Sequence, residues 1–162
     1  MHKFYVLFVG ALLLIACDQN RVFDNYNPIQ NVGWHKDSIQ QFVLPEMDSL
    51  KPYNVYFNIR NNNKYPFSNL FVIASMDFPN GKKQVDTLEY QMALPNGEWL
   101  GEGGASMLEN KLWFKENFQF KEKGNYKISI VQAMRVNGSA TGITYLKGVT
   151  DIGIRVETVE NP

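Results

Sequence analysis

The segment Tyr53-Asn54-Val55-Tyr56-Phe57-Asn58-Ile59-Arg60 carries the strongest secondary-structure signal in the chain. Apolar side chains at 53, 55, 57 and 59 alternate with a second set, at 54, 56, 58 and 60, that is mostly polar. Because successive side chains of a strand point to opposite faces, this period of two predicts a β-strand with one buried face. The asparagines at 61–63 and the following Tyr65-Pro66 then end the strand.

Further strands are predicted after this one. They cover residues 70–78, 82–92, 112–120, 126–134 and 149–157. Pro-Asn-Gly turns at 79–81 and 95–97 separate several of them, because an Asn-Gly pair tolerates the positive φ angles of a tight hairpin. Residues 105–115 contain leucines four apart, but glycines precede them and aromatic residues follow, so we expect a loop leading into a strand.

This spacing of short strands predicts an all-β fold, an antiparallel β-sandwich of about seven to eight strands. A jelly-roll connection is one open alternative, because the sequence does not determine the strand order. The 162 residues, 44% of them apolar, fit one ordinary domain with a packed core.

Residues 1–16 have the layout of a lipoprotein signal peptide. Lys3 is followed by a mostly apolar run over 4–15, which is too short to span a bilayer comfortably. The tetrapeptide Leu14-Ile15-Ala16-Cys17 resembles a bacterial lipobox, in which the cysteine thiol accepts a lipid and becomes the first mature residue. We therefore expect lipid attachment at Cys17, with acyl chains such as palmitate holding the protein to a membrane. The alternative is an ordinary signal peptide followed by a free cysteine.

The mature chain divides into two parts by its composition. Residues 17–33 are polar, rich in asparagine and glutamine and without clear periodicity, which predicts an N-terminal tether. Residues 34–162 carry the strand pattern and are expected to form the β-sandwich domain.

Charge and composition argue against several classes of function. Sixteen basic residues balance sixteen acidic ones and no basic stripe is visible, so nucleic acid is not an expected partner. The single cysteine and two histidines, of which only His35 lies in the mature chain, exclude a multi-histidine zinc site and a thiol-histidine enzyme.

No motif for catalysis or cofactor binding stands out. The glycine-rich stretch 101–106 lacks the lysine of a phosphate loop. The acid pairs Glu98 with Glu102 and Asp77 with Asp86 are what any folded domain of this charge contains. We therefore expect no enzyme, and no catalytic, metal or cofactor site; a hydrolase is the remote alternative.

The three tryptophans support one alternative function. Trp34, Trp99 and Trp113 could form an aromatic platform for sugar rings, as in a glycan-binding β-sandwich lipoprotein that works in nutrient uptake. Burial in the core is the commoner fate of tryptophan in an all-β domain.

Three triplets read Asp, hydroxyl residue, aliphatic residue, which is more than the composition predicts. They are centred on Ser38, Ser49 and Thr87, and they look like an O-glycosylation sequon of Bacteroidota envelope proteins. The alternative is that such triplets suit the starts of strands.

Several blocks of the chain, taken in order, resemble the gliding-motility lipoprotein family GldH of the Bacteroidota. The likeness spans essentially the whole chain, and one departure is the segment 136–145, which is longer than expected. The blocks are Cys17, Trp34, and residues 96–103, 114–120, 123–130, 132–135 and 148–157.

The resemblance implies a non-catalytic cell-envelope lipoprotein that is required for gliding, a component or assembly factor of a machinery linked to type IX secretion. Other envelope proteins of that machinery are its implied partners, and only Cys17 receives a defined role. For the partner surface we predict Trp99 and Arg135, together with the glycine-rich stretch and Met134. No acidic cluster follows Cys17, so we expect a periplasm-facing domain.

Overall fold

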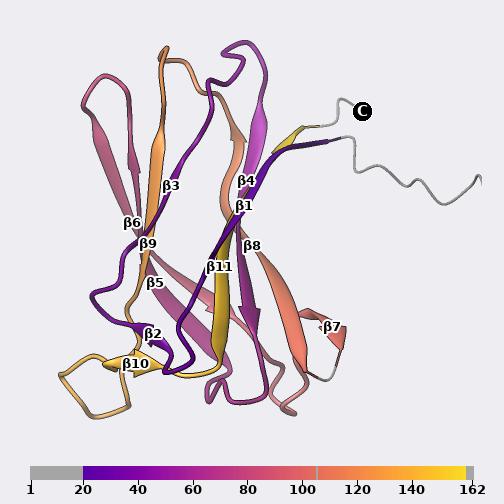
Figure 1. The fold of residues 1–162 in the computed structure, drawn as a ribbon, viewed down its shortest axis with the longest axis vertical. Helices are drawn as coiled ribbons and strands as arrows, with labels where there is room; N and C mark the ends of the chain where they lie inside the picture. The colour runs from indigo at the N-terminus through magenta and orange to yellow at the C-terminus, as the bar shows by residue number, and fades with distance from the viewer. Residues whose placement is uncertain (1–19, 105, 160–162) are drawn as a thin grey trace, which may run out of the picture.

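The structure is a computed structural model that describes residues 20–104 and 106–159, and this part of the chain is built from antiparallel strands (Figure 1). It contains no helix and eleven strands, of which three have only two or three residues. The strands are β1 (Arg21–Pro28), β2 (Trp34–His35), β3 (Gln40–Val43), β4 (Tyr53–Asn61), β5 (Asn69–Asp77), β6 (Lys83–Gln91), β7 (Glu102–Gly104), β8 (Met107–Phe118), β9 (Lys127–Gln132), β10 (Tyr145–Leu146) and β11 (Val149–Thr158).

The strands form two main sheets and a small third one. The first sheet has the order β1-β11-β4-β8-β7, the second has the order β3-β9-β5-β6, and β10 pairs with β2. Every pairing is antiparallel. The two main sheets face each other across one core (Figure 1), which confirms the predicted all-β sandwich.

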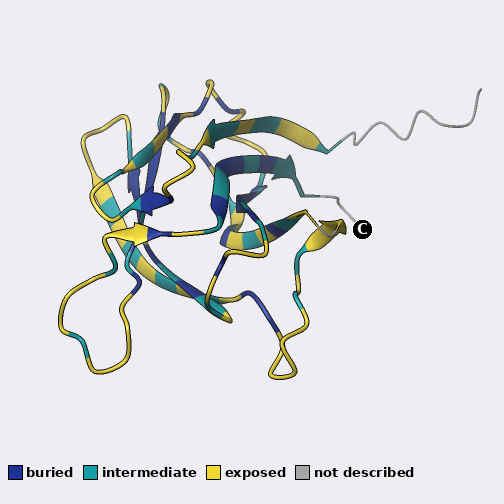
Figure 2. Ribbon diagram, turned by 60° about the horizontal axis from the view of Figure 1, so that its bottom comes forward, coloured by how far each residue is buried: buried dark blue, intermediate teal, exposed yellow. Residues whose placement is uncertain are grey.

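The core lies between the inner faces of the two sheets. The buried face predicted for residues 53–60 is present, because Val55, Phe57 and Ile59 of β4 are completely buried, but Tyr56 and Asn58 on the opposite face are buried as well. The first three belong to one hydrophobic cluster with Val72 and Met76 of β5, and Figure 2 shows that the buried stretches lie in the strands while the loops are mostly exposed. Each such fully buried side chain stabilises the fold by about 1.5–3 kcal/mol relative to exposure.

The structure corrects the predicted N-terminal tether. Residues 21–28 form β1, which pairs with β11 along its whole length. The following Ile29 also bonds to the sheet, through its main-chain N–H and the carbonyl oxygen of Thr150 at 2.8 Å. The folded domain therefore begins near Arg21 rather than at residue 34. Its first strand lies at a sheet edge and is only partly buried, so it lacks a strong apolar alternation.

A close approach of two backbone segments fixes the start of β11. Gly148 has φ of 83°, and a β-carbon there would overlap the main-chain nitrogen of Tyr65. The carbonyl oxygen of Gly148 accepts a 2.8 Å hydrogen bond from the N–H of Asn62. Glycine is therefore required both by its conformation and by the lack of space.

The two ends of the sandwich carry different segments. One end is formed by residues 48–52, 79–82 and 119–125, and we call it the upper end because it lies at the top of Figure 1. Both described termini lie on this side, since the N–H of Val159 bonds to the carbonyl oxygen of Pro52 at 3.2 Å. Asn80 bonds to Glu122 at 3.1 Å, which holds two of the three loops together.

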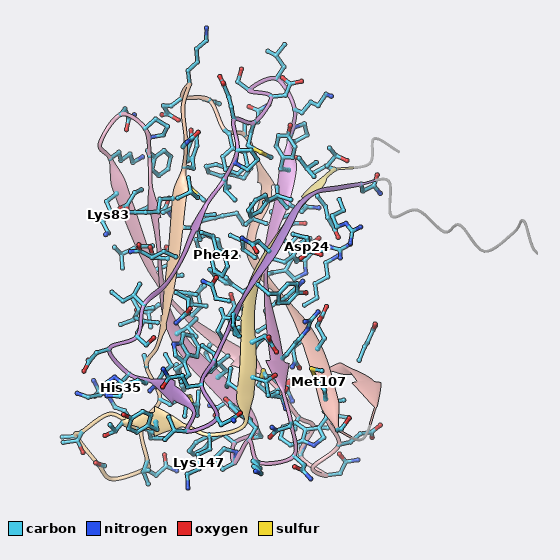
Figure 3. All side chains as sticks on the ribbon, viewed as in Figure 1. Asp24, His35, Phe42, Lys83, Met107 and Lys147 are labelled. Carbon is cyan, nitrogen blue, oxygen red and sulfur yellow. The ribbon has the colours of Figure 1, made fainter. Side chains whose placement is uncertain are left out.

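The opposite, lower end is formed by residues 62–68, 93–99 and 134–148. His35 and Lys147 mark this end in Figure 3, whereas Lys83 lies toward the upper end. The predicted surface residue Arg135 therefore lies at the end away from the termini.

Candidate functional site

A groove of about 1030 Å³ opens at the lower end of the sandwich. Residues 66–69, 93–95 and 134–137 form its walls. These segments are held by main-chain hydrogen bonds, from Ala133 N–H to the Phe71 carbonyl at 2.8 Å and from Met92 N–H to the Ser68 carbonyl at 2.7 Å. The residues that give it its character are Phe67, Phe71, Leu94, Pro95, Met134 and Arg135.

The groove combines apolar walls with a few polar groups. Met134 is buried, and its sulfur accepts a hydrogen bond of 3.1 Å from the N–H of Phe71. Asn69 donates to Glu89 at 2.8 Å, and Arg135 is exposed at the rim. A hollow of this kind suits an apolar segment that also carries an acidic or hydrogen-bonding group.

Trp99 does not share this groove with Arg135. Its ring is half-buried against the core, with its centroid 6.2 Å from that of Tyr65. The turn at 95–97 causes this, because it folds the chain back so that Trp99 pairs with Ala93. Arg135 is therefore an exposed surface residue, whereas Trp99 mainly packs against the core, also at the lower end of the sandwich.

The three tryptophans do not form one platform. Trp34 is completely buried, and its indole N–H donates to the carbonyl oxygen of Ser38 at 2.8 Å. Trp113 lies on β8 with 49% of its surface exposed, and its ring packs on Tyr56 with centroids 4.5 Å apart. The shared aromatic platform considered from the sequence is therefore wrong for Trp34, whose side chain is completely buried.

An ionic network covers the outer face of the five-stranded sheet. Arg60 bonds to Glu109 at 2.6 Å and lies 3.9 Å from the centroid of the Tyr26 ring. Asn58, on the same strand, donates to the Tyr26 hydroxyl at 2.8 Å. Burial raises the pKa of Tyr26 to about 12, so this hydroxyl stays protonated at neutral pH.

The same network continues across β11 and β1. Glu157 accepts from Lys111 at 2.7 Å and from Arg155 at 2.5 Å, and Arg155 also reaches Asp24 at 3.5 Å. Burial opposes ionisation of Glu157, but these hydrogen bonds outweigh it and lower its pKa. Burial raises the pKa of Asp24. The charges are paired with one another, and this arrangement stabilises the outer face of the sheet.

The remaining sequence candidates have ordinary surroundings. His35 is half-buried, accepts a 3.2 Å hydrogen bond from the N–H of Asp37 and packs against Tyr145. Gly103, in the glycine-rich stretch, belongs to β7 and has φ of 143° in a hairpin with β8. No group of three or more histidine, cysteine, aspartate or glutamate side chains could hold a metal ion within the described residues.

The candidate modification sites differ in exposure. Ser49 and Thr87 are exposed, on the 48–52 loop and on β6. Ser38 is half-buried, and its hydroxyl accepts a 2.9 Å hydrogen bond from Gln40. Cys17 lies outside the residues that the structure describes, and in the described part of the chain no helix is long and apolar enough to cross a membrane.

The chain is similar to known proteins over nearly its whole length. The family described as GldH lipoprotein matches residues 21–156. The chain is 50% identical over 157 residues to the gliding motility lipoprotein GldH homolog of Christiangramia forsetii, covering 97% of this chain and 96% of the relative. It is 48% identical over 152 residues to the gliding motility lipoprotein GldH of Flavobacterium johnsoniae, covering 94% of each chain.

Among solved structures, the similarity is weak. The crystal structure of the infectious bursal disease virus VP2 subviral particle matches 85% of this chain and 30% of that chain, with 14% identity and a TM-score of 0.35. A similarity this weak says nothing about function. The family match, in contrast, begins at the first residue of β1 and ends within β11. The chain belongs to the GldH lipoprotein family.

Proposed function

We propose that this protein is a lipid-anchored cell-envelope protein required for gliding motility. It acts as a non-catalytic component or assembly factor of the gliding machinery, which is linked to type IX secretion. The observation that carries this is the 48% identity, along 94% of both chains, to a protein named gliding motility lipoprotein GldH.

Lipid on Cys17 is the proposed means of attachment. The lipobox-like Leu14-Ile15-Ala16-Cys17 supplies the sequence for it, and several acyl chains together give stable membrane attachment where one alone does not. The domain faces the periplasm in this proposal, since no acidic cluster follows the cysteine.

The proposed role is to hold a partner from the envelope machinery. Two features of the structure support a binding role without catalysis. The ionic side chains of the outer sheet face are paired with each other, and the groove beside Arg135 is lined mainly by apolar and amide side chains. The groove with exposed Arg135 is the proposed docking surface, while Trp99 supports it from the core side.

Complementation of a deletion strain tests this proposal. Deletion of the gene is expected to abolish colony spreading, and the full chain is expected to restore it. In a lipid-free variant, a cleavable signal peptide without a cysteine replaces residues 1–17, so that the same domain is exported without lipid. We expect this variant to be present in the periplasm and not to restore spreading. Normal spreading of the deletion strain would overturn the motility role, and full restoration by the lipid-free variant would overturn the anchor.

Glycan binding is the second candidate function, and Trp113 is the observation that favours it. Its half-exposed ring on the outer sheet face, backed by Tyr56, is a surface on which a sugar ring could stack. A glycan array with the folded domain tests it: strong binding that is lost in Trp113→Ala supports this function, and an array without hits removes it.

We also propose O-glycosylation at Ser49 and Thr87, which the structure leaves accessible, and at the less exposed Ser38. The intact mass of protein from the native host tests this. A mass above that of the lipidated chain, reduced stepwise by Ser49→Ala and Thr87→Ala, is the expected result. A mass equal to the lipidated chain alone rules glycosylation out.

A further inference from the structure

The chain is fixed to the sheet very soon after the proposed lipid attachment. The carbonyl oxygen of Asn20 accepts a 2.8 Å hydrogen bond from the N–H of Thr158, and the Thr158 hydroxyl lies 3.4 Å from the same oxygen. Cys17 precedes Asn20 by three peptide steps, which span at most about 11 Å in any conformation. A lipid on Cys17 therefore keeps this part of the sandwich at the membrane surface.

The upper end presents an exposed leucine beside this attachment point. Leu50 is 85% exposed, the highest value among the exposed large hydrophobic residues of the described chain. Its turn is ordered, because Asp48 accepts hydrogen bonds from the N–H groups of Leu50 at 3.0 Å and Lys51 at 3.2 Å. The bond between Val159 and Pro52 places this turn next to the end of β11, the strand that also holds Asn20.

The charge of the upper end fits lipid headgroups. Its three loops, residues 48–52, 79–82 and 119–125, contain four lysines and two acidic residues, and a third acid, Glu46, lies on the same connection between β3 and β4. The lysines are all exposed: Lys51, Lys82, Lys121 and Lys123. Both acids of these loops have partners: Glu122 is bonded by Tyr126 and Asn80, and Asp48 lies 3.6 Å from the ammonium group of Lys51. Lysine side chains can lay their apolar stems along a membrane surface and keep the ammonium group among the phosphates.

We propose that the upper end of the sandwich rests on the bilayer, with Leu50 inserted at the boundary between headgroups and acyl chains. A glycan on Ser49 would hold Leu50 away from the bilayer, so this orientation and glycosylation of Ser49 are alternatives. This inference rests on the proposed lipid anchor at Cys17 and specifies the orientation that the anchor imposes. The nine residues of β4 run between the two ends of the sandwich, a length of about 30 Å. The groove beside Arg135 therefore faces away from the membrane, where a partner can reach it.

The experiment uses the full lipidated chain, in which lipid blocks the only native thiol. Ser49→Cys at the upper end and Asn137→Cys at the lower end each introduce one free cysteine at an exposed position. Each protein is labelled with an environment-sensitive fluorophore and reconstituted into vesicles of phosphatidylethanolamine and phosphatidylglycerol that contain a nitroxide-labelled lipid. We expect the label at 49 to shift to the blue and lose most of its emission by quenching, and the label at 137 to behave as it does in solution.

A charge at position 50 provides the matched comparison. Leu50→Asp should restore the emission of the label at 49, whereas Val136→Asp, at an exposed apolar residue of the lower end, should not. Protein that floats with the vesicles but shows equal, solution-like emission at 49 and 137 overturns the orientation and leaves the anchor intact. An unchanged quenching in Leu50→Asp overturns the insertion of Leu50. Protein that does not float with the vesicles overturns the anchor, and with it both proposals.

Discussion

The hydroxyl of Tyr90 donates a 2.6 Å hydrogen bond to the main-chain carbonyl oxygen of Trp113. Tyr90 lies on β6, the edge strand of the second sheet, and Trp113 lies on β8 of the first. Lys115 and Asp86 form an ion pair of 2.7 Å between the same two strands. These two side-chain contacts therefore hold the two sheets together along this side of the sandwich. The hydrogen bond also occupies the main-chain carbonyl of Trp113, which a strand of another protein molecule could otherwise bind.

Tyr90→Phe tests the energetic value of this link. The substitution keeps the ring and removes only the hydroxyl, so we expect the free energy of unfolding to fall by about 1 kcal/mol. Urea denaturation followed by tryptophan fluorescence measures it. Tyr145→Phe, at an exposed tyrosine, serves as control and should change stability by less than about 0.5 kcal/mol. Equal effects of the two variants would show that the cross-sheet bond contributes nothing.

Gly153→Ala tests the packing of β1 on β11. A β-carbon at 153 would lie 2.6 Å from two carbon atoms of the Tyr26 ring, which covers this glycine from the adjacent strand. We expect a loss of about 1–3 kcal/mol, because the ring must move away. Combining it with Tyr26→Ala should remove most of the additional cost. A cost that is unchanged in the Tyr26→Ala background would mean that the strain lies elsewhere.

Much of the fold is predictable from local pattern. The strand expected at 53–60 is β4, and the one expected at 149–157 is β11, because each has one fully buried face that leaves a period of two in the sequence. β1 leaves no such pattern because it lies at an edge and is half-covered, so its stability comes from contacts such as Tyr26 on Gly153 that are distant in sequence. The order of the strands also depends on contacts between residues that are distant in sequence, so local patterns do not predict it.

Glu157 makes stability depend on pH in a defined direction. Hydrogen bonds from Lys111 and Arg155 outweigh the effect of burial and hold its pKa below the ordinary value of 4.5. Its stabilising contribution is therefore complete above about pH 4.5 and is lost as the pH falls through the folded-state pKa. Asp24, whose pKa burial raises, contributes with the opposite sign and does not produce this loss.

Glu157→Gln should therefore lower stability at pH 7 by about 1–2 kcal/mol and make the acid side of the stability curve shallower. Urea midpoints measured from pH 7 down to about pH 3 test this. Glu98→Gln, in an exposed turn, is the control and should follow the native curve. Parallel acid limbs for the native protein and Glu157→Gln would contradict the assigned role.

Substitutions at Arg135 and at Trp99 should have different effects. Arg135 is exposed at the groove, so Arg135→Ala should leave the free energy of unfolding within about 0.5 kcal/mol and reduce colony spreading at normal protein levels. Trp99 packs against the core, so Trp99→Ala should destabilise the protein by about 2–3 kcal/mol. Normal spreading with Arg135→Ala would remove this residue from the docking surface.

The candidate site is less predictable than the fold. Arg135 and Trp99 both belong to conspicuous blocks of sequence, which favours placing them side by side, but only Arg135 lies at the groove. The local sequence does not distinguish an exposed tryptophan from one that a turn folds back onto the core. Trp99 is of the second kind, because the turn pairs it with Ala93. The groove has no signature in the sequence, since its walls come from three loops that only the strand order brings together.

Mass spectrometry of the mature N-terminal peptide, isolated from the envelope of the native host, tests most directly whether lipid on one residue holds this domain to a membrane. We expect a peptide that begins at Cys17 and carries acyl chains, with residues 1–16 absent. A peptide that begins elsewhere, or a Cys17 whose thiol is free, would contradict it.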